Sequence, residues 1–123
     1  TGVEVSSGAI SSAISAARHA GLSRSAASFI ADDATAWART QSPEDVPDVI
    51  VVNPPRRGIG ADLAAFLNEC SAPRVIYSSC NPGSLATDLA AMPSLRPVEG
   101  RLFDMFPHTT HAEVALLLER EGA

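Results

Sequence analysis

The sequence predicts a doubly wound α/β fold with a mostly parallel sheet. Runs of β-forming residues alternate with segments of helical periodicity over most of the chain, which is typical of parallel strands connected by helices. The run "VIVV" at 49–52 is apolar and β-branched without a break, as expected of a central strand covered on both faces. Two β runs near the C-terminus have no helix between them, so we expect them to pair antiparallel.

Each element is expected from a local pattern. A helix over 6–21 has apolar residues at helical spacing and Gly21 as its stop, and a helix over 82–92 has Pro82 in its first turn. The other expected helices are a short one within 32–40 and one over 60–71. The expected strands, all rich in apolar or β-branched residues, are 2–5, 26–31, 48–52, 74–79, 95–105 and 111–119.

Composition sets the class of protein. A chain of 123 residues with 46% apolar residues is long enough for one domain with a core, but no apolar run approaches the about 18 residues that cross a bilayer. No leader pattern opens the sequence, and two cysteines do not make a disulfide framework. We therefore expect a cytoplasmic protein with free thiols and no membrane contact. The net charge of −5 argues against a broad phosphate-binding surface on this chain.

Polar side chains stand at the carboxyl ends of the expected strands, where α/β sheets bind ligands. Glu4 and Asp33 follow the first two strands, and a carboxylate in such a place often accepts hydrogen bonds from ribose hydroxyls. The plainer interpretation is that each caps a helix or faces water. Asn53 opens "NPPRRG" after the third strand, and Cys80 lies in "SSCNP" after the fourth.

Two proline residues hold Asn53 on a stiff support. An amide that donates and accepts suits the imide edge of uracil or another nucleobase edge, whereas the structural alternative is a strand terminator with a turn at Gly58. An amino-methyltransferase would also use an Asn-Pro-Pro turn, but with an aromatic residue next. Arg56 stands there instead, which weakens that alternative.

Cys80 has two interpretations: a small buried side chain that closes a strand, or a nucleophile at the edge of the sheet. Cys70 has no such context and is expected to pack in a helix. His108, His111 and Glu113 raise the possibility of a metal site, but the helical His-Glu pattern of zinc hydrolases is absent from the sequence. We therefore predict no metal.

Three segments, "VVNPPRRGIG", "IYSSCNP" and "LFDMFPHTTHAEV", occur in an order and at separations that resemble the RNA 5-methyluridine methyltransferases. The resemblance extends over essentially the whole chain and is greatest to the branch that modifies 23S ribosomal RNA. Most family members carry Asp where Asn53 stands, and Asn is typical of that branch. The resemblance implies a Rossmann-like class I methyltransferase domain over 1–123, with S-adenosylmethionine as cofactor and 5-methyluridine as product.

The resemblance also implies the roles of individual residues. Cys80 would be the nucleophile, and Glu113 the general base that removes a proton from carbon 5 of uracil. Strand alternation would place His111 on the same face as Glu113, and the helix begun by Pro82 would favour the thiolate together with Arg56. The implied binding residues are, for the cofactor, Glu4, Asp33 and Asn53, and, for the substrate, Asn53, Arg56 and His111.

Two family parts are not in this sequence: the glycine-rich first strand, and the N-terminal region with an RNA-binding module and an iron–sulfur cluster. We expect a piece of a longer protein whose full-length form binds ribosomal RNA. The missing strand would lie between 2–5 and 48–52, so each would have an open edge. We expect the 123-residue chain alone to bind the cofactor poorly, to be inactive and to self-associate. The alternative function is a non-catalytic domain that acts only through self-association or protein binding.

Overall fold

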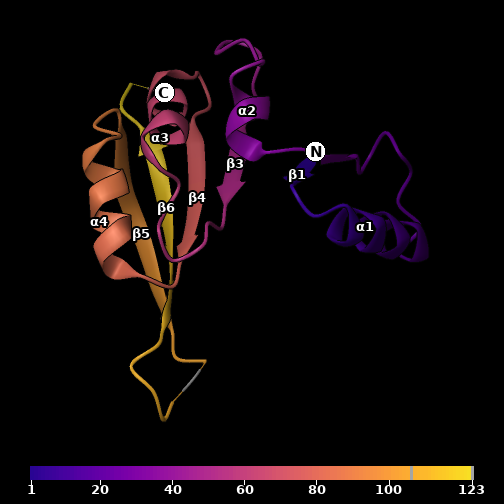
Figure 1. The fold of residues 1–123 in the computed structure, drawn as a ribbon. Coiled ribbons are helices and arrows are strands. Elements are labelled where there is room, and N and C mark those ends of the chain that lie inside the picture. Colours follow the sequence, from indigo (N-terminus) through magenta and orange to yellow (C-terminus); the bar gives the residue numbers. More distant parts are fainter. Residues whose placement is uncertain (106, 123) are drawn as a thin grey trace. The chain divides into compact units, whose positions relative to one another are not determined.

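The computed structural model describes residues 1–105 and 107–122, which form two compact units, 1–41 and 42–123. Among these residues no helix has both the length and the apolar character needed to span a membrane. Each unit alternates strands and helices (Figure 1), in agreement with the α/β class predicted from the sequence. The assignment of 1–123 to a single catalytic domain stays a prediction.

The first unit contains β1 (Gly2–Glu4), α1 (Ser7–His19), β2 (Phe29–Ala31) and α2 (Ala34–Ala38). Its two strands pair in parallel, as predicted for a strand-helix-strand connection. Helix α1 begins at Ser6, whose Oγ accepts a hydrogen bond from the amide of Ala9. Gly21, at φ 74°, follows its end, as expected for a glycine stop.

The strand expected over 26–31 is shorter than predicted. The carbonyl of Ser23 accepts hydrogen bonds from the amides of Ala26 and Ala27, so these residues form a turn and pairing begins only at Phe29. The prediction of a strand here was correct, but its start was wrong because a local turn competes with the sheet for the same backbone amides.

The second unit contains four strands and two helices. They are β3 (Val49–Val52), α3 (Ala61–Glu69), β4 (Arg74–Ser79), α4 (Pro82–Ala90), β5 (Leu95–Phe103) and β6 (Glu113–Arg120). The strand order is β3-β4-β6-β5. The β3–β4 pair is parallel, whereas β6 is antiparallel to both β4 and β5. The predicted C-terminal hairpin is therefore confirmed, and its second strand inserts next to β4.

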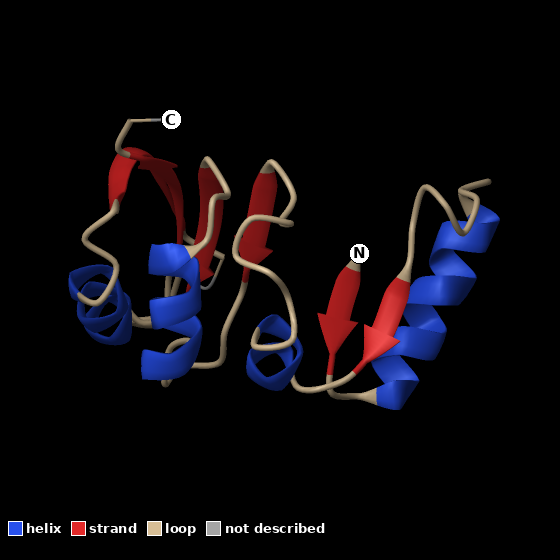
Figure 2. Ribbon diagram, turned by 90° about the horizontal axis from the view of Figure 1, so that it is seen from above, coloured by secondary structure: helices blue, strands red, loops and turns tan. Residues whose placement is uncertain are grey.

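Helices α3 and α4 cover one face of this sheet (Figure 2). The core beneath them is formed by apolar side chains of the two helices, the turn after α4 and strands β4, β5 and β6, namely Ala64, Leu67, Val75, Tyr77, Leu85, Met92, Leu95 and Leu118. Burial alternates along β4, as a strand with one covered face requires.

Strand β3 differs from the prediction of a central strand. It is an edge strand of its sheet, paired only with β4, and Val49 and Val51 on it are 40% and 66% exposed. Strand β1 also has one paired side within the described residues. The open edges predicted for 2–5 and 48–52 are therefore confirmed. Each of the two strands lies at the edge of its own unit's sheet.

Candidate active site at the carboxyl ends of β3 and β4

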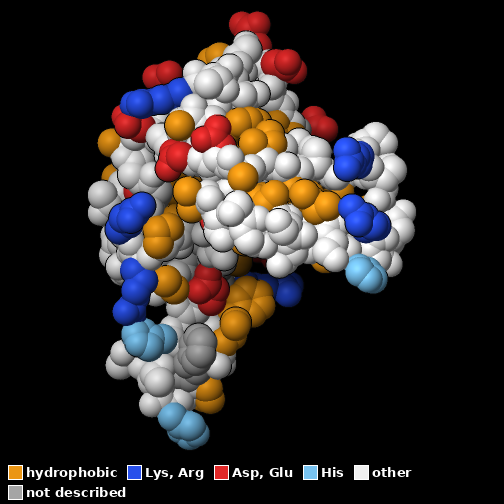
Figure 3. Space-filling model, turned by 45° about the vertical axis from the view of Figure 1, so that its right-hand side comes forward, with side chains coloured by type: hydrophobic (Ala, Val, Ile, Leu, Met, Phe, Trp, Pro, Cys, Tyr) orange, Lys and Arg blue, Asp and Glu red, His pale blue; other side chains and the backbone are white. Residues whose placement is uncertain are grey.

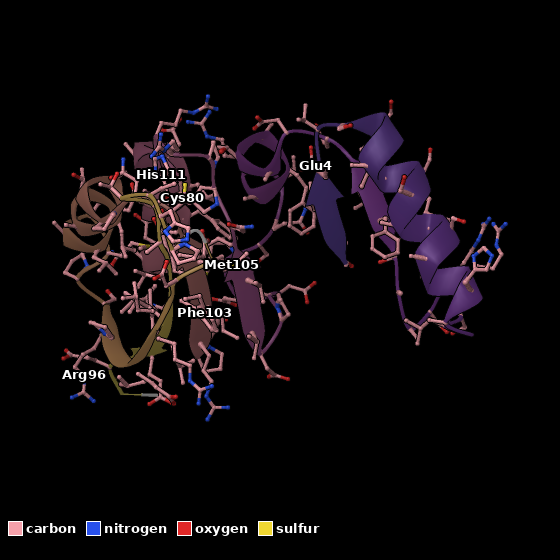
Figure 4. All side chains as sticks on the ribbon, turned by 90° about the horizontal axis from the view of Figure 1, so that it is seen from below. Glu4, Cys80, Arg96, Phe103, Met105 and His111 are labelled. Carbon is pink, nitrogen blue, oxygen red and sulfur yellow. The ribbon has the colours of Figure 1, made fainter. Side chains whose placement is uncertain are left out.

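The loops that follow β3 and β4 meet at one edge of the sheet, because the two strands are parallel. The loop after β3 contains Asn53 and Arg56, and the turn after β4 contains Cys80 and Asn81. The side-chain Nδ2 of Asn81 donates a hydrogen bond of 2.9 Å to the backbone carbonyl of Arg56. This bond ties together two segments that are 25 residues apart. Figure 4 looks onto this end of the sheet and labels Cys80 and His111 there.

The turn that carries Cys80 is fixed by short-range hydrogen bonds. Ser79 Oγ accepts a hydrogen bond from the amide of Asn81 and donates one to the carbonyl of Asn81, both at 3.1 Å. Asn81 is the N-cap of α4, with Oδ1 accepting from the amide of Gly83, and Pro82 occupies the first turn as predicted. Cys80 is half-buried and free. It directly precedes the N-cap residue of α4.

The register of β4 against β6 brings Cys80 to Glu113. Ser78 pairs with Ala115 and Ser79 with Val114, and the next step along the same register sets Cys80 opposite Glu113. Ser78 Oγ donates a hydrogen bond of 2.5 Å to Glu113 Oε1, so the carboxylate is held beside the end of β4. A thiol and a half-buried carboxylate thus share one strand end, as the sequence predicted for both.

Arg56 and His111 form a second link between distant loops. The guanidinium of Arg56 lies 2.7 Å from Nδ1 of His111. Because a guanidinium only donates, Nδ1 accepts and the ring proton is on Nε2. Both side chains are exposed.

The sequence argument for His111 was wrong in one respect. Strand β6 begins at Glu113, so His111 lies in the preceding loop and strand alternation does not place it. The strand begins later because residues before it form turns, with Thr109 Oγ1 accepting from the amide of His111. The bond to Arg56 brings His111 to the site instead. The same bond engages the guanidinium that was expected to favour the Cys80 thiolate.

Asn53 is exposed and follows directly on β3. Val52, the residue before it, pairs with Tyr77, three residues before Cys80. The side-chain amide of Asn53 is thus at the same end of the sheet as the thiol of Cys80, the carboxyl end of the parallel strands. Pro54 and Pro55 end the strand beyond it, as predicted.

The two carboxylates of the first unit lie at the ends of its own parallel strands. Glu4, labelled in Figure 4, accepts through Oε1 from the amide of Ser6 at 2.8 Å. Asp33 is the N-cap of α2 and accepts through Oδ1 from the amide of Ala36 at 2.9 Å. Both are exposed. The plainer interpretation, helix and turn capping, therefore holds for both. A carboxylate has about four acceptor positions, so each can also accept ribose hydroxyls.

Three residues near the site were not singled out from the sequence: Ser78, Asn81 and Asp88. The position of Asn81, directly before a helix-starting proline, is a recognisable N-cap pattern. Asp88 lies at helical spacing between Leu85 and Met92, which both face the core. An acidic residue in such a row is a detectable sign of a buried polar contact.

A metal cluster or a cavity would be an alternative site of chemistry. Within 1–105 and 107–122, no three His, Cys, Asp or Glu side chains gather closely enough to hold a metal ion. A cavity of about 320 Å³ lies in the first unit, lined by residues of α1, the loop after it and the start of β2 that include Ile14, Arg18, Leu22 and Phe29. These residues are apart from Glu4 and Asp33, so we give the cavity no role in the chemistry.

Comparisons with known proteins agree with this geometry. Residues 45–121 match the family model of tRNA (uracil-5-)-methyltransferases. The chain is 47% identical over its whole length to the 23S rRNA (uracil(747)-C(5))-methyltransferase RlmC of Shewanella amazonensis, covering 32% of that protein. It is 48% identical over 98% of its length to RlmC of Halothiobacillus neapolitanus, covering 31%. The chain thus spans about a third of the length of these curated relatives.

A solved structure is also similar. The tRNA (uracil-54, C5)-methyltransferase of Pyrococcus abyssi, in complex with S-adenosyl-L-homocysteine, superposes with a TM-score of 0.81 at 30% identity. The match covers 95% of this chain and 28% of that one. The Rossmann-like methyltransferase fold predicted from the sequence is confirmed. The chain belongs to the tRNA (uracil-5-)-methyltransferase family.

Proposed function

We propose that the full-length protein methylates carbon 5 of a uridine in 23S ribosomal RNA, with S-adenosylmethionine as the methyl donor. The observation that carries this proposal is the β4–β6 register, in which Ser79 pairs with Val114, so that Cys80 and Glu113 are the next residues on the two strands, with Ser78 bonded to the carboxylate. A nucleophile and a base that can both reach one uracil ring are what carbon 5 methylation needs. The names of the relatives support the reaction and the RNA.

In this mechanism the Cys80 thiolate adds to carbon 6 of the uracil. The sulfur–carbon bond forms and the electron pair of the 5,6 double bond moves into an enolate, which makes carbon 5 nucleophilic. The cofactor supplies an electrophilic methyl group at this carbon. Glu113 then takes the carbon 5 proton, the double bond reforms and the thiolate leaves. Ser78, which donates to Glu113 Oε1, keeps the carboxylate beside the ring.

Asn53, Arg56 and His111 are the proposed substrate contacts. An exposed amide donates to and accepts from the imide edge of uracil, and the exposed guanidinium suits a phosphate of the RNA backbone. The bond from Arg56 to Nδ1 leaves the Nε2 proton of His111 as a donor toward the RNA.

The proposed cofactor contacts are Glu4, Asp33 and Asn53. The fit to the cofactor rests on hydrogen-bond acceptors. Glu4 and Asp33 are exposed carboxylates at the ends of parallel strands, and one oxygen of each accepts from a backbone amide. The remaining acceptor capacity suits hydroxyl donors such as those of a ribose. The complex of the Pyrococcus protein supports the choice of cofactor.

The test uses the full-length protein, methyl-labelled S-adenosylmethionine and two substrates, a 23S rRNA transcript and a tRNA transcript. We expect label in the 5-methyluridine of the ribosomal RNA only. Cys80→Ala should reduce the rate by at least about 100-fold, because a covalent nucleophile is lost. Cys70→Ala, which changes the buried thiol of α3's C-cap, is the matched control and should stay near wild type. A Cys80→Ala protein with more than about a tenth of the wild-type rate excludes the covalent role.

The open strand edges favour a second, separate property of the 123-residue chain, self-association. Strands β1 and β3 are each paired on one side among the described residues, and the exposed Val51 lies on β3. Unpaired backbone groups on such edges pair readily with another copy. Sedimentation of the isolated chain should show a dimer or larger species, and a monomer at all concentrations would contradict this.

A further inference from the structure

Asp88 is an acidic residue in the core. It lies on the inner face of α4 and is 6% exposed, in a row with the buried Leu85 of the same helix and the buried Met92 just after the helix end. Burying a carboxylate is costly unless it receives hydrogen bonds. An apolar residue at this place would pack without that cost, so the bonds that Asp88 makes are the feature to explain.

Those bonds come from two other segments. The hydroxyl of Tyr77, on β4, donates to Asp88 Oδ2 at 2.5 Å, and the amide of Ile59 donates to the same oxygen at 2.9 Å. Gly58 passes so close to the carboxylate that a Cβ on it would overlap Oδ2. One carboxylate therefore joins helix α4, strand β4 and the loop that carries Asn53 and Arg56.

Tyr77 is a dependable donor for this arrangement. Its side chain is fully buried, and burial together with the hydrogen bond to Asp88 raises the pKa of the phenol well above its usual range. The hydroxyl thus keeps its proton at any physiological pH, and the link between β4 and α4 persists.

The three segments that Asp88 joins are the ones around Cys80, the proposed nucleophile. Cys80 stands between Tyr77 and Asp88 along the chain, three residues after the first and eight before the second. The loop that Asp88 anchors through Ile59 also receives the Asn81 side chain, on the carbonyl of Arg56. The loop is thus attached to the Cys80 turn at one point and to α4 at another.

We propose that Asp88 is a positioning residue that fixes the loop 53–60 relative to Cys80. It touches neither substrate nor cofactor, and acts by holding Asn53 and Arg56 where they meet the uracil next to the thiol. This inference rests on the proposed function for its effect on catalysis, but not for its effect on the loop.

The experiment compares variants of the full-length protein by hydrogen–deuterium exchange and by steady-state methylation. Asp88→Leu keeps the branched shape of the side chain and removes the acceptor. Asp88→Asn keeps an oxygen for both donors and is the conservative rescue. Thr87→Ala is the matched control on the exposed side of α4, where Thr87 Oγ1 bonds only the carbonyl of Gly83.

We expect faster exchange in the peptide that covers 53–60 and a fall in kcat of about 100-fold for Asp88→Leu, since small displacements of positioning groups have effects of that size. The KM for RNA should change far less. Asp88→Asn should return the exchange rate to that of wild type and kcat to within about threefold of it. Thr87→Ala should match wild type in both measurements.

The buried thiol of Cys70 reports whether a variant is folded. Trypsin separates Cys70 and Cys80 into different peptides, since it cleaves at Arg57 and Arg74, and Cys70 should stay protected from iodoacetamide in every folded variant. If Asp88→Leu exposes Cys70, Gly58→Ala takes its place, because it displaces the loop from an intact carboxylate.

Unchanged exchange of 53–60 in the folded variant overturns the inference, whatever the activity. Faster exchange with unchanged kcat overturns the catalytic part. A wild-type protein that does not methylate RNA refutes the proposed function alone, because the exchange measurement still decides whether Asp88 fixes the loop.

Discussion

Two groups of candidate residues in this chain are held in place in different ways. The carboxylates of Glu4 and Asp33, in the first unit, bond to backbone amides two and three residues away. Around Cys80, in the second unit, the bonds Asn81 to Arg56, Ser78 to Glu113 and Arg56 to His111 join residues 25 to 55 positions apart. The first arrangement is available to a short peptide, whereas the second exists only when the whole sheet has formed.

This difference has a chemical reason. A group that accepts hydroxyl hydrogen bonds tolerates small displacements, because hydrogen-bond geometry is broad. A nucleophile and a base must approach the reacting atoms within a few tenths of an ångström, since misplacement by about 1 Å has large effects on rate. Long-range bonds and a buried anchor at Asp88 provide that restraint at Cys80.

The largest effect is expected when the base of the restrained group is removed. Glu113→Gln in the full-length protein should lower turnover by about 100-fold to 10,000-fold, because the carbon 5 proton is no longer taken. Attack by Cys80 and methyl transfer should still occur, so protein joined to RNA should accumulate. Denaturing electrophoresis with labelled RNA measures this species.

Glu119→Gln is the control for that experiment. Glu119 lies on the same strand, bonded to the exposed Arg74, and its substitution should leave turnover unchanged. Normal turnover by Glu113→Gln without any adduct would show that the base is another residue.

The next effect concerns two glycines of one loop. Gly58 and Gly60 both have positive φ, at 86° and 79°, but only Gly58 lies against Asp88. Gly60→Ala should cost about 1–3 kcal/mol of the free energy of unfolding, because its φ of 79° and ψ of 164° lie in a region that is essentially limited to glycine. Gly58→Ala should cost about 2–5 kcal/mol, because overlap adds to it. Urea denaturation compares them, and equal losses would mean that the contact with Asp88 has no energetic weight.

A smaller effect should follow from changes at Asp33, one of the two carboxylates that are held by local hydrogen bonds. Asp33→Ala should cost about 1 kcal/mol of stability through the lost N-cap of α2, whereas Asp33→Asn keeps the cap. Both should weaken S-adenosylmethionine binding by about tenfold if the carboxylate accepts ribose hydroxyls. Calorimetry of the full-length protein measures the affinity. Full affinity in Asp33→Asn would restrict Asp33 to capping.

The smallest effect is a dependence of stability on pH. The pKa of Tyr77 is raised by burial and by its bond to Asp88, so the folded state holds this proton more tightly than the unfolded state. Its contribution is complete below the unfolded pKa of about 10 and is lost as pH rises above it. Thermal unfolding between pH 8 and 11 should show a steeper loss in wild type than in Tyr77→Phe. Equal slopes would contradict the assignment.

Much of the fold could be predicted from local patterns. Strand β4 has the predicted bounds, and α4 begins at the predicted Pro82, because an apolar run followed by a helix-starting proline has few alternatives. The pattern "VIVV" predicts a doubly covered strand but says nothing about which neighbours are present. The open edge of β3 was expected only from the family's missing first strand. The late start of β2 was not predicted either, because the turn at Ser23 uses backbone amides that an apolar run would be expected to give to the sheet.

The sequence by itself determined which chemical groups this protein has and at which strand ends they stand: a thiol before a helix, an amide before two prolines, and carboxylates after short strands. Local propensities and chain connectivity are enough for that. Only the tertiary structure decided that His111 reaches Arg56 from a loop, that Ser78 holds Glu113, and that the buried Asp88 anchors the loop after β3. Those contacts depend on strand register and on which helix face is buried, and both are set when distant segments pack together.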